Sequence, residues 1–300
     1  MSYHTSIMLD ECIEGLNIKE NGIYVDLTFG GGGHSKAILE KLKGGHLYAF
    51  DQDEDAGKNA QDIDSSSFTF IQSNFRYLKK YLKFYGVNKV DGILADLGVS
   101  SHQINEATRG FSTRFEGPLD MRMGQSTDKT AEQVLNEYSE QELHKILGMY
   151  GEVKNAKTLA AEIVRQRVNS PLRTIGDFKN ILSRYASRGR ENKYFAQVFQ
   201  AVRIEVNEEL KVLEEMLGQS EEVLKEGGRL AVMSFHSLED RIVKNYVNKG
   251  KVHGDVEKDI FGNLLRPFQP VNKKPITAKE EELKLNNRAR SAKLRVAEKL

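Results

Sequence analysis

The sequence has little cysteine, proline and tryptophan: one Cys, five Pro and no Trp in 300 residues. The single cysteine, Cys12, excludes an internal disulfide and most cysteine-ligated metal sites, and no other metal-ligand constellation is apparent, so no metal is expected. No apolar run approaches the ~20 residues of a membrane-spanning helix. The first ten residues also lack the basic and then apolar pattern of a signal peptide. These absences predict a cytoplasmic protein without a membrane partner.

Charge of one sign is also lacking, because 44 Lys and Arg face 43 Asp and Glu, a net charge of +1. Total charge therefore says nothing about a polyanionic partner, and only local clustering can. Hydrophobic residues make up 39% and charged residues 29%, which is typical of a folded globular protein. The length suits one large domain or two smaller ones.

The most informative stretch is residues 22–35, where a short apolar strand is followed by four consecutive glycines and a helical pattern. In such a layout the backbone can approach a nucleotide-like ligand closely, because no Cβ stands in the way. A second predicted strand, residues 46–50, is followed by Asp51, nineteen residues after Gly32. A carboxylate at that distance is placed to accept hydrogen bonds from both hydroxyls of a ribose.

The missing phosphate motifs narrow the choice of ligand. The dinucleotide spacing G-x-G-x-x-G fails because Ser35 stands at its last position, and the phosphate-binding G-x-x-x-x-G-K-[ST] is absent. Asp26 precedes the glycines, where a carboxylate would repel a pyrophosphate and attract a cation. S-adenosylmethionine is a nucleoside with a sulfonium, an amino group and no phosphate, so it fits better. A glycine-rich turn without any ligand is the alternative.

Strands and helices alternate along the first half of the chain and again near its end. A third strand is predicted at residues 68–75, a helix at 76–85, a fourth strand at 90–97, a short helix at 220–225 and a fifth strand at 229–235. This alternation predicts a mostly parallel, Rossmann-like α/β sheet that is covered on both faces.

Ligands of such sheets bind beyond the carboxyl ends of the strands, where the strand order reverses. We therefore expect the residues at those ends to converge in space. They are residues 30–34, Asp51, Phe75, Asp96 and residues 234–236.

Residues 107–207 differ in pattern, because they are helical without a convincing strand. Capping boxes are predicted at residues 130–133 and 139–142, and one long helix at 194–217. We therefore predict a sheet domain from residues 1–106 and 208–300, interrupted by an all-helical insertion at 107–207. The insertion has about the size of an independent domain.

The insertion carries a basic segment between Arg165 and Arg203. Nine basic residues stand there against two acidic ones, an excess of seven positive charges, and Tyr185, Tyr194 and Phe195 lie among them. A second basic cluster occupies residues 288–295. Basic runs interleaved with aromatic residues suit a phosphate backbone with bases stacking nearby. A nucleic-acid partner is therefore favoured over solvated surface helices, and the insertion is predicted to recognise it.

Taken together, these features resemble the MraW family nearly end to end. The motifs that carry the resemblance are residues 4–11, 26–35, 91–101, 109–112, 117–123, 199–204, 234–244 and 288–295. Members of this family are the small-subunit ribosomal RNA methyltransferases H, which methylate N4 of a cytidine in the decoding region. The resemblance implies a class I S-adenosyl-L-methionine-dependent methyltransferase whose partner is 16S rRNA within the small ribosomal subunit. The oligomeric state stays open, with a homodimer among the alternatives.

The resemblance also implies the residues of the site. It assigns cofactor binding to Gly32, Gly33, His34, Asp51, Phe75, Asp96 and Gln103. Asp96 is the first candidate to orient the cytosine amino group, and Asp120 and His236 are further catalytic candidates. For His236 the alternative is simple packing, with Ser237 capping the following helix. This chain departs from the family at Gly31, where an arginine is common.

Two other functions remain open at this point. A small-molecule methyltransferase would carry an apolar insertion rather than a basic one. A non-catalytic RNA-binding protein with a relic fold would have lost Asp51 or the glycines. Cytosine C5 methylation is set aside because it needs a cysteine nucleophile, and Cys12 lies in a helical, packed position.

Overall fold

The computed structural model describes residues 6–300, which form two compact units. One comprises the chain up to Gly98 together with Leu210–Leu300, and the other comprises Val99–Glu209. The second unit begins at residue 99 rather than at the predicted 107. A hydrogen bond ties the added segment to the second unit, because the side chain of Gln103 donates to the carbonyl of Met123 at 3.4 Å.

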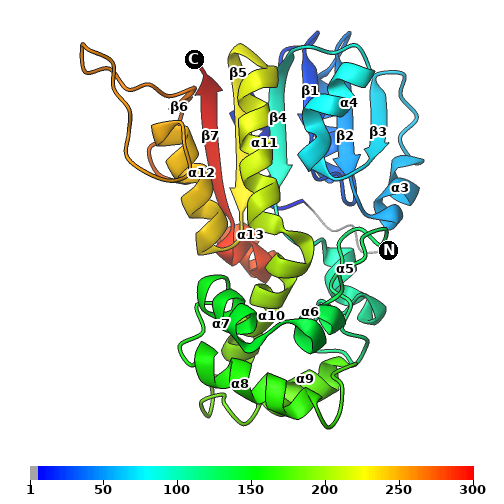
Figure 1. The fold of residues 1–300 in the computed structure, drawn as a ribbon. Helices are drawn as coiled ribbons and strands as arrows, with labels where there is room; N and C mark the ends of the chain where they lie inside the picture. Colours follow the sequence, from blue (N-terminus) through cyan, green and yellow to red (C-terminus); the bar gives the residue numbers. More distant parts are fainter. Residues whose placement is uncertain (1–5) are drawn as a thin grey trace. The chain divides into compact units, whose positions relative to one another are not determined.

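The first unit contains a seven-stranded sheet in the order β3-β2-β1-β4-β5-β7-β6 (Figure 1). Strands β1 to β5 are parallel, whereas β7 runs antiparallel to both β5 and β6. The bounds are β1 Ile23–Asp26, β2 His46–Asp51, β3 Phe68–Gln72, β4 Val90–Asp96, β5 Leu224–Ser234, β6 Phe268–Pro270 and β7 Lys293–Lys299. In the central β4 every residue except Asp96 is buried, as expected for a parallel strand covered on both faces.

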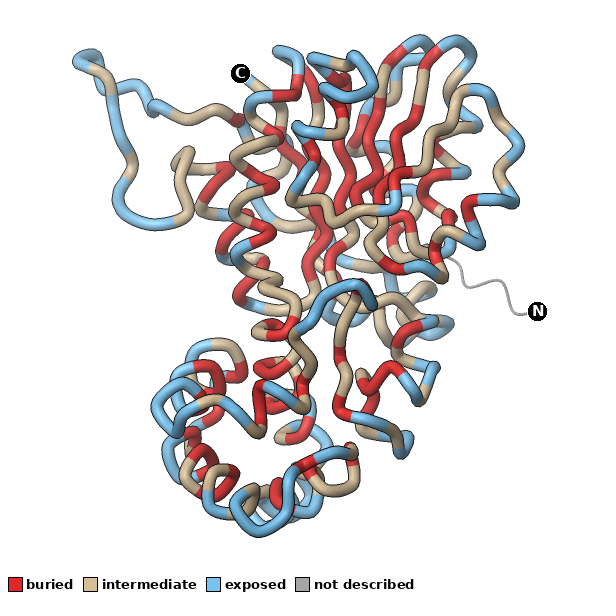
Figure 2. Tube along the Cα trace, turned by 45° about the vertical axis from the view of Figure 1, so that its right-hand side comes forward, coloured by how far each residue is buried: buried red, intermediate tan, exposed pale blue. Residues whose placement is uncertain are grey.

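Helices cover both faces of this sheet, so the fold is doubly wound. One face packs against α4 (Leu78–Phe84), α11 (Glu209–Val223) and α12 (Ser237–Lys249). The other packs against α1 (Leu9–Leu16) and α2 (Gly33–Lys41), with α3 (Glu54–Ala60) in a smaller cluster. The burial is greatest in the middle of the sheet, where β1, β2 and β4 are almost entirely buried, and Figure 2 shows buried residues gathered there in red. The Rossmann-like α/β fold predicted from the sequence is confirmed.

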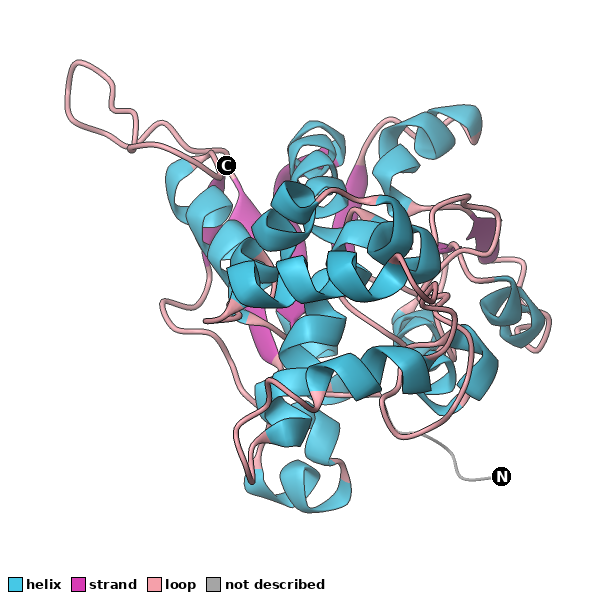
Figure 3. Ribbon diagram, turned by 60° about the horizontal axis from the view of Figure 1, so that its bottom comes forward, coloured by secondary structure: helices cyan, strands magenta, loops and turns pink. Residues whose placement is uncertain are grey.

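The second unit is a helical bundle with a hydrophobic core of its own. Its helices are α5 Ser101–Asn105, α6 Ala131–Glu137, α7 Glu140–Met149, α8 Ala156–Arg167, α9 Ile175–Leu182 and α10 Glu191–Asn207, drawn among loops in Figure 3. Within residues 99–209 the only strand-type pairing is an isolated bridge between Pro118 and Thr174. Both predicted capping boxes are present, at Thr130 before α6 and at Ser139 before α7.

The long helix predicted at residues 194–217 is wrong, because Glu208 interrupts it. This residue adopts a left-handed conformation with φ of 50° and separates α10 from α11. Helix α11 then continues through the region of the short helix predicted at 220–225, and β5 begins at Leu224.

Two strand predictions also need correction. The third strand ends at Gln72, and Phe75 begins a 3-10 helix, Phe75–Tyr77, because the Asn74 side chain accepts a hydrogen bond from the backbone N–H of Arg76 at 2.9 Å. Strands β6 and β7 were not predicted at all. Among residues 6–300, no helix has the length and apolar character needed to cross a bilayer.

Candidate active site

The carboxyl ends of β1, β2 and β4 meet at one edge of the sheet, where the strand order reverses between β1 and β4. The backbone N–H of Asp96 donates to Thr28 Oγ1 at 2.7 Å, and the N–H of Gly30 donates to Asp51 Oδ2 at 2.8 Å. The end of β5 joins them, because Leu97 donates its N–H to the carbonyl of Met233 at 3.0 Å. The predicted convergence is confirmed for the ends of β1, β2, β4 and β5, whereas the place of Phe75 at this edge stays a prediction.

The glycine turn between β1 and α2 is held in a conformation that favours glycine. Gly30 and Gly32 have φ of 52° and 78°, in the left-handed region. A Cβ on Gly32 would lie 2.8 Å from the ring of Phe29, whereas one on Gly31 would meet no atom within 4 Å. The backbone at Gly31 therefore faces open space, which leaves room for the arginine that the family resemblance leads one to expect there. Helix α2 begins at Gly33, so its first-turn N–H groups lack intrahelical acceptors.

Asp51 is prepared as a double acceptor at the end of β2. Its Oδ2 accepts from Gly30 and its Oδ1 accepts from the backbone N–H of Asp53 at 2.9 Å, so each oxygen keeps further acceptor capacity. Burial raises the pKa of Asp51 to about 6, although both hydrogen bonds favour the charged form. The carboxylate is ionised at neutral pH and is close to its titration range.

Asp26, which was predicted to attract a cation, is instead hydrogen-bonded inside the protein. Its side chain is fully buried, and its oxygens accept from the Ser35 hydroxyl at 2.6 Å and from the Thr28 N–H at 3.1 Å. Asp26 therefore holds the glycine turn against α2. Its charge still acts on the site, because it contributes to raising the pKa of Asp96.

Asp96 is a partly buried carboxylate whose side chain is not fully hydrogen-bonded. Its Oδ1 is buried and has no hydrogen-bond partner within residues 6–300. Burial, together with the charges of Asp26 and Glu239, raises its pKa well above the usual value. A buried acceptor without a partner costs free energy, so a cationic or hydrogen-bond-donating ligand beside Asp96 would recover that cost.

His34 faces Asp96 but is held by the N-terminal segment. Its Nε2 lies 3.1 Å from the carbonyl of Ile7, and because a carbonyl only accepts, Nε2 carries the proton. Burial lowers the pKa of His34, which favours the neutral ring. In the neutral ring Nδ1 carries a lone pair and no proton, and it lies 3.9 Å from Asp96 Oδ2. The His34 ring thus fixes the turn, and its backbone N–H belongs to the first turn of α2.

His236 is the N-cap of α12, so the predicted cap at Ser237 is wrong by one residue. Its Nδ1 accepts from the Glu239 N–H at 3.4 Å, and the Glu239 carboxylate accepts from the N–H groups of Phe235 and His236. The buried Glu239, which was not predicted as part of the site, lies close enough to raise the pKa of Asp96. The signal was present in the sequence as a glutamate three residues after the cap.

Phe75, Gln103 and Asp120 have different surroundings. Phe75 is half-buried against the core of the first unit, three residues beyond the end of β3. Gln103 belongs to the second unit, where its Oε1 accepts from Ser100 at 3.0 Å and its Nε2 donates to Met123 at 3.4 Å. Asp120 also belongs to that unit.

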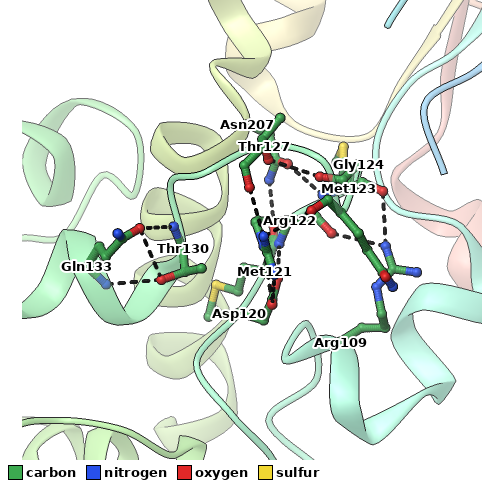
Figure 4. A network of polar contacts seen from close by, with 11 residues as sticks. Arg109, Asp120, Met121, Arg122, Met123, Gly124, Thr127, Thr130, Gln133 and Asn207 are labelled. Carbon is green, nitrogen blue, oxygen red and sulfur yellow. Dashed lines mark hydrogen bonds and ion pairs between the residues drawn. The ribbon is translucent and has the colours of Figure 1, made fainter. Parts of the chain in front are cut away.

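Asp120 is paired with Arg122 in the network of Figure 4. Arg122 donates to both carboxylate oxygens of Asp120, at 3.0 and 2.8 Å, and to the carbonyl of Thr127 at 2.8 Å. Arg109 donates to the carbonyls of Arg122 and Met123, both at 3.0 Å. The network was not predicted from the sequence, and it gives Asp120 the role of holding a loop.

The basic segment of the insertion is partly neutralised by acids outside the counted window. Arg165 and Arg184 both pair with Glu162, at 2.6 and 3.5 Å, and the hydrogen bonds from Arg165 are the main cause that lowers the pKa of Glu162 to about 2. Arg203 pairs with Glu209 at 2.8 Å. The exposed cations that remain in this segment include Arg173, Arg188, Arg190 and Lys193.

The C-terminal basic cluster is largely structural. Lys293 and Arg295 lie on β7 and pair with Asp240 of α12, at 3.2 and 2.7 Å. These contacts attach the antiparallel edge of the sheet to its covering helix. They weaken the prediction that this cluster contacts a nucleic acid.

The strand order and the carboxylates at its reversal point define a Rossmann-like enzyme class that binds a nucleoside cofactor across the switch point. The chain matches the MraW methylase family over residues 1–300 and belongs to that family. The methyltransferase fold and the S-adenosyl-L-methionine cofactor expected from the resemblance are thereby confirmed.

Similar proteins cover the whole length of the chain. A protein named ribosomal RNA small subunit methyltransferase H from Cytophaga hutchinsonii is 60% identical over 297 residues, 99% of each chain. Proteins of the same name from Christiangramia forsetii and Flavobacterium johnsoniae are 55% and 52% identical over 301 residues, 100% of this chain and 99% of theirs.

Proposed function

We propose that this protein transfers a methyl group from S-adenosyl-L-methionine to the exocyclic N4 of a specific cytidine in the decoding region of 16S rRNA. Its partner is the small ribosomal subunit in the cytoplasm. Family membership and the names of the relatives support the rRNA substrate. The site is assigned mainly from Asp96, whose buried Oδ1 has no hydrogen-bond partner within residues 6–300, and from the open space at Gly31 of the glycine turn.

The residues at the carboxylate edge fit this cofactor. Asp51 has acceptor capacity for both ribose hydroxyls, and the N–H groups of Gly33 and His34 at the start of α2 suit the carboxylate of the methionine moiety. Asp96 suits the sulfonium side, because a cation stabilises its ionised form. Gly32, and Phe75 against the adenine, complete the proposed set in the first unit, and Gln103 stays a prediction from the family resemblance.

Positioning dominates the chemistry that the chain must supply. The sulfonium provides an already activated methyl group when the cofactor is bound. Holding donor and acceptor in line in a dry site contributes about 7–11 kcal/mol, whereas a general base contributes about 3–5 kcal/mol. A strongly basic side chain is therefore not required.

The acceptor nitrogen is the harder problem, because the lone pair of the cytosine amino group is delocalised into the ring. Acceptors that bind its N–H groups allow the nitrogen to pyramidalise. We assign this role to Asp96 with the backbone carbonyls of residues 97–99. Asp120 and His236 remain second candidates, and their contacts with Arg122 and Glu239 favour supporting roles.

Methyl transfer with labelled cofactor tests the proposal. Free cytidine, naked rRNA and small subunits are offered in parallel, and the nucleosides are analysed by mass spectrometry. We expect N4-methylcytidine from the subunits and at most weak labelling of free cytidine. Transfer to free cytidine alone would indicate a small-molecule enzyme, and no transfer to any RNA would overturn the proposal.

Asp96→Asn tests the assignment of the acceptor. This variant keeps the size of the side chain but loses the charge, so we expect weaker cofactor binding and a loss of turnover of roughly 10²-fold or more. Unchanged affinity and turnover would contradict the role of Asp96.

A further inference from the structure

A basic segment of the first unit, residues 75–90, runs through α4. Residues 75–90 contain five basic residues and no acid. Three of the five are engaged within the first unit: Arg76 pairs with Glu215, Lys79 pairs with Glu222, and Lys89 donates to backbone carbonyls.

The two remaining cations, Lys80 and Lys83, are exposed on α4. Within residues 6–300 neither has a carboxylate at ion-pair distance, and Lys80 Nζ lies 5.8 Å from the ring centre of Tyr77. Their charge is therefore available to an anionic partner.

Aromatic side chains are exposed beside these lysines. The exposed fractions are 47% for Tyr77, 78% for Phe84 and 42% for Tyr85. Lys80 and Phe84 are four residues apart, which places them on one face of α4, and Tyr77, at the end of the preceding 3-10 helix, lies beside Lys80. We call Tyr77, Lys80, Lys83, Phe84 and Tyr85 the α4 surface.

The exposed rings are held in place by the sheet. Phe84 contacts Tyr85 edge to face at 5.2 Å between centroids, Tyr85 contacts Tyr48 at 5.5 Å, and Tyr48 contacts His46 at 4.6 Å. His46 begins β2 and Asp51 ends it. At about 3.3 Å per residue, the ring contacts at His46 therefore lie roughly 16 Å along the strand from Asp51. The end of the α4 surface that holds Phe84 and Tyr85 is thus a pre-ordered platform away from Asp51.

We propose that the α4 surface binds single-stranded RNA, with phosphates on Lys80 and Lys83 and a base stacked on Phe84. The identity of the partner as RNA rests on the proposed function. Charge of a single sign complements a phosphate backbone, and exposed aromatic faces accept any unpaired base. A protein partner fits less well, because lysine is depleted in the cores of protein interfaces. A duplex fits less well, because its bases are stacked inside.

Binding of a fluorescent, unstructured 20-nucleotide RNA to the full chain tests this surface. In the triple variant Lys80→Ala/Lys83→Ala/Phe84→Ala we expect affinity to fall by roughly 5- to 150-fold from the lost stack alone. The slope of log affinity against log salt should fall by about 1.4, since each lost phosphate contact on a single strand contributes about 0.7. Adenosine affinity should not change.

The matched control is Val271→Ala/Lys273→Ala/Lys274→Ala, which removes the same charge and one apolar side chain from another exposed segment of the first unit. It should bind the oligonucleotide like the wild type. Phe84→Tyr should retain affinity and Phe84→Leu should lose it, because only a ring can stack.

Three outcomes would overturn the inference. They are equal binding by the triple variant and the wild type, equal binding by Phe84→Leu and Phe84→Tyr, and a loss confined to assembled subunits, which would indicate a protein partner. If the triple variant binds RNA like the wild type but sediments differently, the α4 surface is an interface with a second copy of the chain. These outcomes can be told apart from a failure of the proposed function, in which the wild-type protein would transfer no methyl group to RNA.

Discussion

The charge of Asp51 should set the pH dependence of nucleoside binding. Burial raises its pKa to about 6, so the carboxylate protonates as the pH falls through 6 and loses acceptor capacity for ribose hydroxyls. We expect the Kd for adenosine to rise below pH 6, by at most about tenfold per pH unit for a single proton. Adenosine is the right probe because it carries no sulfonium and no carboxylate that would report on Asp96 or α2.

The control for this prediction is Asp51→Asn, which cannot titrate. It should bind adenosine more weakly than the wild type at pH 7.5, with a nearly flat profile between pH 5 and 7.5. Parallel profiles for the two proteins, measured by isothermal titration calorimetry, would show that another group governs the dependence.

Residue patterns predicted the carboxylates at the strand ends, but not the groups that surround them in the folded protein. Asp51 and Asp96 could be placed because each follows a run of strand-forming residues, and parallel strands end at a common edge. The raised pKa of Asp96 could not be predicted, because its main cause is the burial of the side chain, which depends on tertiary packing. A smaller contribution comes from Glu239, which is 143 positions away in the chain. The contact of His34 with Ile7 carries no sequence signal either.

At the scale of elements, Asn207 is expected to stabilise the loop of the second unit through its position at the end of α10. Its Oδ1 accepts from Met123 at 2.7 Å, and its Nδ2 donates to Met121 and Arg203 at 2.8 and 2.9 Å (Figure 4). Asn207→Ala leaves these backbone groups without their partner. We expect a loss of roughly 1–3 kcal/mol in the free energy of unfolding of this unit, measured by urea titration.

Two variants give this prediction its controls. Asn207→Asp keeps the acceptor for Met123 but turns a carboxylate oxygen toward the carbonyls of Met121 and Arg203, so it should destabilise the unit at least as much as Asn207→Ala. Asn248→Ala removes one exposed hydrogen bond to Lys244 and should change stability by less than about 0.5 kcal/mol. A loss equal to that of Asn248→Ala would contradict a role for Asn207 in the loop.

Elements with local signals were predictable, and those decided by distant contacts were not. The capping boxes at Thr130 and Ser139 are contained within four residues each, so the sequence alone identifies them. The break at Glu208 involves neither glycine nor proline, and apolar spacing continues across it. Strand β7 was hidden because its basic residues suggested a nucleic-acid surface, whereas Arg295 in fact pairs with Asp240.

At the scale of the whole molecule, counting charge along the chain overestimated the basic character of the insertion. The excess of seven charges between Arg165 and Arg203 excluded Glu162 and Glu209, which lie just outside that window and pair with its arginines. The basic segment at residues 75–90 was not predicted as a binding surface. Local charge becomes informative only after the ion pairs formed by folding are subtracted.

The two hydrophobic cores should give the molecule two unfolding transitions. Leu213 is buried in the core of the first unit and Phe178 in that of the second, and truncation costs about 2–5 kcal/mol for Leu→Ala and about 3–5 kcal/mol for Phe→Ala. In differential scanning calorimetry, we expect Leu213→Ala and Phe178→Ala each to lower a different transition. Adenosine should raise the transition that Leu213→Ala lowers, because Asp51 and the glycine turn belong to that unit and a ligand stabilises only the state that binds it. If both substitutions lowered one shared transition by similar amounts, the two cores would unfold as a single cooperative unit and this division would have no thermodynamic meaning.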